Sequence, residues 1–257
     1  MPEGLEAEIY RRAAERVVGR AVAAVEVDDR QAMAGELRHA LPGRTVMSAR
    51  RCGKLVVLDL DDTVALGLHF GMTGRLIVDG FAPIDELVYA SGRDDPAWNR
   101  LVLTFTDGTL LRVNDPRRWA AFTLDPDVER LGPDFLDLSA DLLGERLRGR
   151  RAAVKTLLLD QTIVAGFGNL CIDEVLFQAG VAPGASVAEL THEQLGEIAA
   201  AARRHLPAML ERGGSHTGVL TPVLRALLPP CPRDGAPLQR STVGGRTTVW
   251  CPVHQIV

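Results

Sequence analysis

No run of apolar residues in this chain approaches the roughly 20 that a membrane-spanning helix needs. The first residues are acidic and polar, whereas a secretory signal starts basic and continues apolar, so a signal peptide is not expected. There is no internal repeat and no low-complexity tract. The only cysteines, Cys52, Cys171, Cys231 and Cys251, are far apart, and disulfides are not expected in a reducing compartment. We therefore expect a globular cytoplasmic protein.

The chain also lacks an excess of positive charge, because its formal net charge is −4. Nucleic-acid binders are usually basic, so this value counts against that class. The cations are nevertheless clustered, with five of them and no acid between Arg146 and Lys155. Smaller clusters lie at Arg50 and Arg51 and at Arg117 and Arg118. Each cluster alone is equally compatible with an ordinary solvated surface.

Periodicity divides the chain into a β-rich part and a helical part. Residues 3–18 have helical apolar spacing, and short β-rich runs follow from 21 to 124, including a hairpin around Asp107-Gly108. Strands at this spacing predict a sandwich or a barrel. Later segments predict helices at 139–149, 151–160, 169–180 and 191–211. The last of them begins with the capping-box pattern Thr191-His192-Glu193-Gln194.

The expected fold class is α+β with several domains. We expect an N-terminal part at 1–131, a helical part at 132–228 and a C-terminal tail at 229–257. The tail is too short to bury a core of its own, so it needs a staple such as a metal ion.

Two ligand pairs in the tail have metal-site spacing. Cys231 and Asp234 are three residues apart, as are Cys251 and His254, and the two pairs flank a hairpin-like stretch with Gly244-Gly245 at its turn. Zinc accepts sulfur, nitrogen and oxygen ligands, so these four residues predict a zinc ribbon. The alternative is a hairpin without zinc, in which Asp234 caps a turn.

Six segments carry a family resemblance that covers the whole chain. They are, in order, MPEGLEAE, RRCGKLVVLDL, HFGMTGRL, NDPRRWAAF, LLLDQTIVAGFGNLCIDEVLFQAGVAP and GRTTVWCPVHQ. Together they resemble the formamidopyrimidine-DNA glycosylase / endonuclease VIII family of bacterial base-excision repair enzymes. The resemblance implies a β-sandwich, a helix–two-turn–helix domain and a zinc ribbon. It also implies a monomeric, nucleoid-associated DNA glycosylase with AP lyase activity, whose partner is double-stranded DNA carrying a damaged base or an abasic site.

The same resemblance gives a reason for the Pro-Glu start. Proline and an acidic residue suit the first turn of any helix, but removal of Met1 would also expose Pro2 as a secondary amine. An α-amino group has a pKa of about 8, against about 10.4 for lysine, so part of it is neutral and nucleophilic near pH 7. The resemblance implies that Pro2 forms a Schiff base with the sugar. Glu3 would then be the general acid/base, and Lys54 a phosphate contact that assists catalysis.

The family's DNA-binding positions also match residues of this chain. By resemblance, His69, Lys155, Asn169 and Arg246 hold DNA phosphates, and Met72, Arg117 and Trp119 fill the gap left by a flipped base. The full expected set is Glu6, His69, Met72, Arg117, Arg118, Trp119, Lys155, Asn169 and Arg246. Without the resemblance, Met72 and Trp119 would be interpreted as core residues and Arg117 as a surface ion-pair partner.

The sequence departs from the family pattern at several positions. Leu5 replaces a proline, Trp119 replaces a phenylalanine, and Leu170-Cys171 stands where an aromatic residue is usual. The ribbon has Asp234 and His254 where cysteines are usual. Only 16 residues separate Gly214 from Cys231, which leaves no room for the family's loop over an oxidised purine, so 8-oxoguanine is a disfavoured substrate.

Two other functions remain open from the sequence. One is a non-catalytic protein of the same fold that binds lesions or DNA structures, which the shortened loop and the altered turn favour. The other is an RNA- or ribosome-associated binder. Retention of both Pro2 and Glu3 favours the enzyme.

Overall fold

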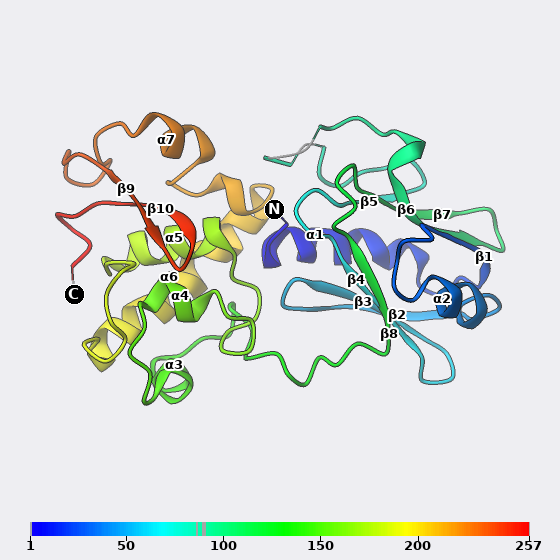
Figure 1. Ribbon diagram of the computed structural model, residues 1–257, viewed down its shortest axis with the longest axis horizontal. Coiled ribbons are helices and arrows are strands. Elements are labelled where there is room, and N and C mark those ends of the chain that lie inside the picture. Colours follow the sequence, from blue (N-terminus) through cyan, green and yellow to red (C-terminus); the bar gives the residue numbers. More distant parts are fainter. Residues whose placement is uncertain (1, 86, 89–90, 257) are drawn as a thin grey trace. The chain divides into compact units, whose positions relative to one another are not determined.

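The computed structural model describes residues 2–85, 87–88 and 91–256, and the chain forms two compact units, 1–128 and 129–257 (Figure 1). The expected border at residue 131 stays a prediction. The helices of the second half and the C-terminal tail share the second unit, and the expected border at residue 228 stays a prediction. In the described part of the chain, no helix has the length and hydropathy to cross a membrane.

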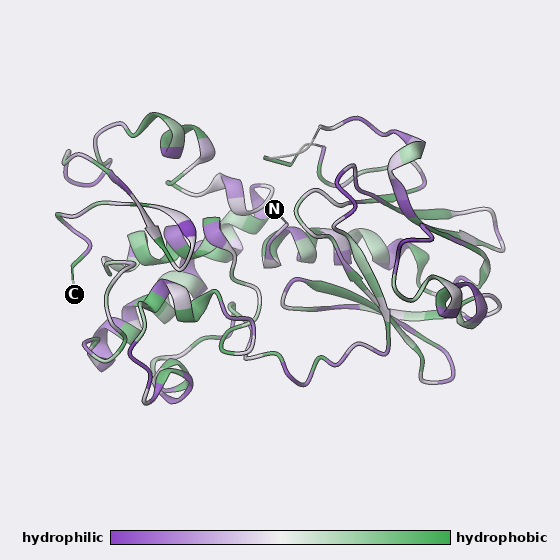
Figure 2. Cartoon of the chain, in the orientation of Figure 1, coloured by the Kyte–Doolittle hydropathy of each residue, from purple (hydrophilic) through white to green (hydrophobic). Residues whose placement is uncertain are grey.

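Two antiparallel four-stranded sheets build the first unit. One has the order β1-β6-β7-β5, formed by Val22–Val27, Asn99–Phe105, Leu110–Asn114 and Arg75–Val78. The other has the order β2-β3-β4-β8, formed by Val46–Cys52, Leu55–Leu60, Ala65–His69 and Ala121–Leu124. Apolar side chains of both sheets join one buried cluster, which confirms the sandwich (Figure 2).

Helix α1 (Gly4–Ala14) contacts β2 and β3 of one sheet and β5 of the other. Its buried Tyr10 lies 4.5 Å from the Phe70 ring, centroid to centroid, and donates a hydrogen bond to the Gly74 carbonyl at 3.2 Å. Burial raises the pKa of the Tyr10 hydroxyl, with a further contribution from the charge of Glu6. The beginning of the chain is therefore fixed against the sandwich, and 3₁₀ turns at Glu15–Val17 and Pro96–Trp98 complete the unit with α2 (Ala34–Ala40).

The sequence pattern did not predict β2 or α2. Only Val46 is fully buried in β2, so this edge strand has no apolar run to mark it. Helix α2 has seven residues and buries only Ala34 and Leu37, too few for a recognisable helical period.

The second unit contains the four predicted helices, observed as α3 (Ala140–Leu147), α4 (Val154–Leu158), α5 (Asn169–Ala179) and α6 (His192–Glu211). The capping box of α6 is confirmed: the Gln194 N–H donates to Thr191 Oγ1 at 3.2 Å, and the Thr191 N–H donates to Gln194 Oε1 at 2.9 Å. A 3₁₀ turn (Ser215–Thr217) and α7 (Pro222–Leu227) were not predicted.

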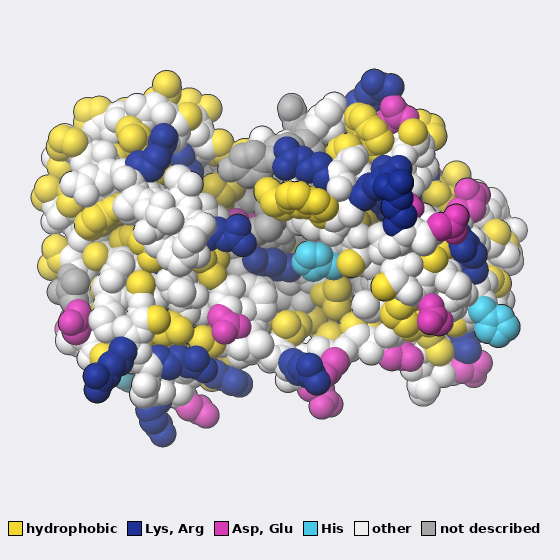
Figure 3. Space-filling view, viewed as in Figure 1, with side chains coloured by type: hydrophobic (Ala, Val, Ile, Leu, Met, Phe, Trp, Pro, Cys, Tyr) yellow, Lys and Arg dark blue, Asp and Glu magenta, His cyan; other side chains and the backbone are white. Residues whose placement is uncertain are grey.

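The tail forms the predicted hairpin from β9 (Gln239–Val243) and β10 (Arg246–Trp250). Both turn glycines, Gly244 and Gly245, have the left-handed backbone that the turn requires (φ 58° and 71°). The hairpin shares a small apolar cluster with α5, made of Phe177, Leu220, Cys231, Leu238, Val249 and Cys251. On the face drawn in Figure 3, Lys and Arg side chains form several separate groups with acids between them.

The turn before α5 depends on Gly166. Its φ is +109°, and a Cβ there would lie 2.4 Å from the ring of Phe135, which stacks edge-on against Phe167. The glycine therefore fixes the path of the chain into the helix start.

We expect Gly166→Ala to destabilise the protein by about 2 kcal/mol or more, because it combines a disfavoured φ with a steric clash. Gly149→Ala is the matched control, since φ is +75° but nothing lies within 4 Å of its Cβ. It should cost about 1 kcal/mol, from the left-handed backbone alone. The measurement is the melting temperature of each variant, and equal shifts would contradict the clash.

Candidate functional site

The start of α1 gathers Pro2, Glu3 and Glu6 in a buried setting. Glu3 is 1% exposed and Glu6 3% exposed, and the Glu3 N–H donates to Glu6 Oε2 at 2.7 Å. A carboxylate in this first turn is favoured by the positive end of the helix. The structure thus places two buried acids beside the predicted nucleophile.

Lys54 and His69 lie close together on one sheet. Lys54 is in the turn between β2 and β3, and His69 pairs with the next residue, Leu55, across β3 and β4. His69 Nδ1 accepts a hydrogen bond from the Gly71 N–H at 3.2 Å. Partial loss of hydration lowers the pKa of His69, and the Lys54 charge lowers it further. Near pH 7 the imidazole is therefore neutral, and it can meet a phosphate as a hydrogen-bond donor through Nε2.

Trp119 and Arg117 occupy an exposed loop after β7. Trp119 is 52% exposed, which excludes the core role considered from the sequence. The Arg117 guanidinium lies 5.7 Å from the centroid of the Trp119 ring, and in the described part of the chain Arg117 has no ion-pair partner. Met72 is half-buried in the turn between β4 and β5.

A single buried carboxylate joins these two loops. Asp115 Oδ1 accepts hydrogen bonds from the Arg117 N–H at 3.1 Å and from the hydroxyl of Thr73, the neighbour of Met72. Its Oδ2 accepts from the N–H groups of Trp119 at 2.6 Å and of Ala120 at 2.8 Å. Asp115 was not singled out in the sequence, although an aspartate followed by proline and polar residues is a turn signal. Asp115 therefore links the loop of Arg117 and Trp119 to the turn that contains Met72, so one carboxylate connects the three expected gap-filling residues.

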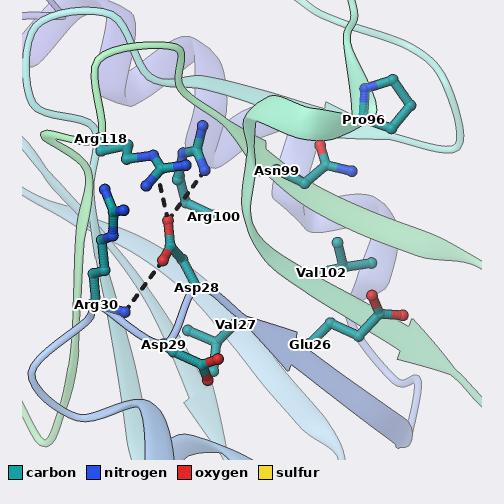
Figure 4. Close-up of a pocket in the computed structure, with 10 residues that line it drawn as sticks. All are labelled: Glu26, Val27, Asp28, Asp29, Arg30, Pro96, Asn99, Arg100, Val102 and Arg118. Carbon is teal, nitrogen blue, oxygen red and sulfur yellow. Dashed lines mark hydrogen bonds and ion pairs between the residues drawn. The ribbon is translucent and has the colours of Figure 1, made fainter.

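Arg118 lines a cavity of about 550 Å³ in the first unit. Figure 4 shows Arg118, Arg100 and Arg30 around Asp28. Asp28 Oδ2 lies 3.1 Å from Arg100 Nη1 and 3.8 Å from Arg118 Nε. Burial favours the neutral acid, but the Arg30 N–H and the Arg100 guanidinium outweigh it and lower the pKa of Asp28. Arg118 is thus tied to Asp28, with a left-handed backbone (φ 59°).

Lys155 departs from the expectation that it contacts a DNA phosphate. Such a contact needs an exposed ammonium group, and the Lys155 side chain is fully buried. Its Nζ lies 2.6 Å from Asp173 Oδ1 and donates to Thr248 Oγ1 at 2.7 Å. A lysine is buried only when it is paired, and Asp173 supplies the partner. Sequence reasoning missed Asp173, which is one of two adjacent buried acids in α5.

Asn169 and Arg246 lie at neighbouring ends of two elements of the second unit. Asn169 is the first residue of α5, and its Nδ2 donates to the Thr247 carbonyl at 2.9 Å, directly after the exposed Arg246. Asn169 Oδ1 is buried and has no hydrogen-bond partner among the described residues. A helix N-terminus next to an amide and a guanidinium favours an anion such as phosphate.

The four predicted ligands of the tail converge. One ligand atom each of Cys231, Asp234, Cys251 and His254 lies within 4.8 Å of the others, so the group can hold a metal ion. His254 Nδ1 lies 3.2 Å from Asp234 Oδ2 and 3.5 Å from Cys231 Sγ. Its Nε2 lies 3.2 Å from the Phe177 carbonyl, which favours the tautomer with a free lone pair on Nδ1.

The charges of this cluster also suit a cation. The Ala236 N–H, at 2.9 Å from Oδ1, is the largest of the contacts that lower the pKa of Asp234 to about 2. Asp234 therefore caps a turn and faces the cluster at the same time, so its capping role does not exclude a metal ion. Burial raises the pKa of the Cys231 thiol, which a bound cation would oppose.

Two family models match the chain. Residues 1–122 match the formamidopyrimidine-DNA glycosylase N-terminal domain, and residues 131–221 match the formamidopyrimidine-DNA glycosylase H2TH domain.

The chain is similar along its length to curated bacterial proteins. It is 34% identical over 277 residues to formamidopyrimidine-DNA glycosylase of Stenotrophomonas maltophilia, with 98% of each chain covered. It is 35% identical over 275 residues to the enzyme of the same name from Geobacter metallireducens, again with 98% of each covered.

Solved structures agree. The Lactococcus lactis Fpg in complex with DNA containing an abasic site superposes with a TM-score of 0.82 at 26% identity, covering 98% of this chain and 99% of that one. The same protein in complex with DNA containing an oxidised pyrimidine gives a TM-score of 0.82 at 28% identity, covering 99% of each chain.

We expect Asp115→Asn to loosen the Trp119 loop. The amide NH₂ is a donor, so it cannot accept the backbone N–H hydrogen bonds that one carboxylate oxygen accepts in the wild type. The loss of charged hydrogen bonds should cost about 2 kcal/mol or more. Acrylamide quenching of the Trp119 fluorescence, obtained by difference from Trp119→Phe, should increase. Asp125→Asn is the control, because among the described residues this exposed carboxylate accepts only the Ala65 N–H, and the Asn carbonyl oxygen can still accept it. Unchanged quenching in Asp115→Asn would show that the loop does not depend on this carboxylate.

Proposed function

Because the chain belongs to the formamidopyrimidine-DNA glycosylase family, we propose that it excises a damaged base and cuts the strand at the abasic site with the Pro2 amine as nucleophile. That it is a DNA glycosylase for damaged bases or abasic sites follows from its relatives and their DNA complexes. The relatives are bacterial, so we place the protein at the bacterial chromosome. The observation that supports the nucleophile is the buried group of Pro2, Glu3 and Glu6 at the start of α1.

The proposed chemistry needs only these groups and water. The neutral Pro2 nitrogen forms a bond to the sugar C1′, and the base leaves with its bonding electrons and takes up a proton. Ring opening of the sugar gives an iminium, which acidifies the C2′ proton. Removal of that proton expels the 3′ phosphate and cuts the strand, and water releases Pro2. Glu3 is placed beside the amine and is the candidate to give and take the protons at the sugar.

The DNA contacts come from both units. In the first, Lys54 and His69 are the candidate phosphate contacts near the chemistry, and Met72, Arg117 and Trp119 are the candidate gap-filling residues. The exposed Trp119 ring supports this role, because a flipped base leaves an apolar gap that a ring can fill. In the second, Asn169 and Arg246 are the candidate phosphate clamp.

The candidate metal is a structural zinc ion held by Cys231, Asp234, Cys251 and His254. Zinc would cross-link the two ends of the β9-β10 hairpin, and it takes no part in the sugar chemistry. The mixed sulfur, nitrogen and oxygen donor set, with the His254 tautomer set by Phe177, supports this assignment.

The base specificity is proposed from the segment between Gly214 and Cys231. It forms a 3₁₀ turn and α7, and the contact of Arg225 with Asp173 holds α7 against α5. Because this leaves no long loop to close over an oxidised purine, 8-oxoguanine is a disfavoured substrate. Oxidised pyrimidines, ring-opened purines and abasic sites are the classes to screen.

Pro2→Gly should lower the yield of covalent adduct trapped by borohydride on duplex DNA with one abasic site, by at least about 100-fold. The reason is that the secondary amine, which forms the iminium, is replaced by a less nucleophilic primary one. Mass spectrometry must first confirm that Met1 has been removed, since a retained Met1 blocks the amine. Tight binding by wild type without any adduct would instead favour the non-catalytic lesion binder.

Asp234→Ala should weaken zinc binding at least about tenfold, and Asp234→Cys should strengthen it, because thiolate is a better zinc ligand than carboxylate. Competition with a chromophoric chelator measures both affinities. Removal of the metal should lower the melting temperature of the wild type more than that of Asp234→Ala. If Asp234→Ala held zinc as tightly as wild type, Asp234 would only cap its turn.

A further inference from the structure

Arg225 has no part in the chemistry proposed above, yet it is among the least exposed arginines of the chain. It lies on α7 and is 9% exposed. Its Nη1 donates to Asp173 Oδ2 at 2.6 Å, and its Nη2 donates to the Thr247 carbonyl at 3.0 Å. One guanidinium therefore joins α7 to α5 and to β10.

Asp173 lies between two cations. Arg225 approaches one carboxylate oxygen and Lys155 approaches the other, each at 2.6 Å. Burial raises the pKa of this carboxyl above its ordinary value, although the two cations in direct contact favour its ionised form.

The Thr247 carbonyl is where this cluster meets the candidate phosphate clamp. It accepts hydrogen bonds from Asn169 Nδ2 at 2.9 Å, from Arg225 Nη2 at 3.0 Å and from Lys155 Nζ at 3.4 Å. A carbonyl oxygen has two lone pairs, so three donors share it, and losing one redistributes the others. Arg246 is the residue before this carbonyl, so its backbone is fixed by the same contacts.

We propose that Arg225 is a positioning residue for DNA binding, which holds Asn169 and Arg246 in the geometry that receives a phosphate. It acts through the Thr247 carbonyl and Asp173 and does not itself touch DNA. This inference rests on the proposed function, because it assumes that Asn169 and Arg246 bind phosphate.

The first test compares zinc-loaded full-length wild type with Arg225→Gln. The readout is the Kd for a duplex with one tetrahydrofuran abasic-site analogue, measured over a series of salt concentrations. We expect the Kd to rise about tenfold. The slope of log K against log salt should become shallower by the amount that corresponds to about one phosphate contact. Arg203→Gln is the matched control: it removes a guanidinium of the same unit that bonds the Leu138 carbonyl, and it should leave the Kd within about twofold.

A second test separates positioning from support of the fold. Arg225→Gln in an Asn169→Ala/Arg246→Ala background should change the Kd less than about twofold, because the residues through which it acts are gone. If Arg225→Gln still raised the Kd about tenfold in that background, the inference would be wrong. It would also be wrong if Arg225→Gln lowered the melting temperature but bound DNA like wild type. If Arg225→Gln does not fold, Arg225→Lys serves, since it keeps the charge but cannot reach both acceptors as a fork. Its Kd should be raised, and a wild-type Kd would overturn the inference.

The DNA preference of the wild type tests the proposed function, and the effect of Arg225→Gln tests the role of Arg225. A wild type that does not prefer the abasic duplex over undamaged duplex would overturn the proposed function. A wild type with that preference, unchanged in Arg225→Gln, would overturn only the role of Arg225.

Discussion

The second unit depends on one buried contact, the Asp173 carboxylate between Lys155 and Arg225. Removing any of the three leaves a buried charge without its partner, which is far more costly than losing a surface ion pair. Through these side chains α4, α5, α7 and β10 meet at one point. The candidate phosphate clamp is built on that point, so its geometry follows from an interior electrostatic constraint and not from the exposed cations alone.

The first unit also depends on a buried carboxylate. Asp115 is buried and satisfied by a hydroxyl and three backbone N–H groups, and it holds the loop that exposes Trp119. The proposed insertion of the Trp119 ring into DNA would cost little further entropy, because its loop is already fixed. Buried acids such as Glu3, Glu6, Asp115 and Asp173 also help to explain how a DNA-binding chain carries a net charge of −4. These carboxylates accept hydrogen bonds and pair with cations inside the protein. The net charge computed from composition therefore overstates the negative charge of the surface.

Local patterns predicted much of the fold and of the site. The four helices of the second half, the capping box of Thr191 and the Gly244-Gly245 hairpin follow from short-range chemistry, and the metal cluster follows from two spaced pairs joined by that hairpin. What the sequence could not give are the partners of buried acids. Asp115 bonds Thr73, 42 positions away, and Asp173 contacts the Val249 N–H, 76 positions away. Without that knowledge Lys155 could not be distinguished from an exposed phosphate ligand.

The ribbon is restrained at two separate places. The candidate metal ligands join the chain segments outside the hairpin, at Cys231 and Cys251, while Asp173 and Arg225 hold the hairpin itself at Val249 and Thr247. A hairpin this short is not stable alone in water, so both restraints contribute to its stability. Loss of the metal would free the ends first and leave Thr247 pinned. An oxygen ligand such as the candidate Asp234 would therefore be sufficient here, because the contacts at Thr247 hold the chain next to Arg246 without the metal.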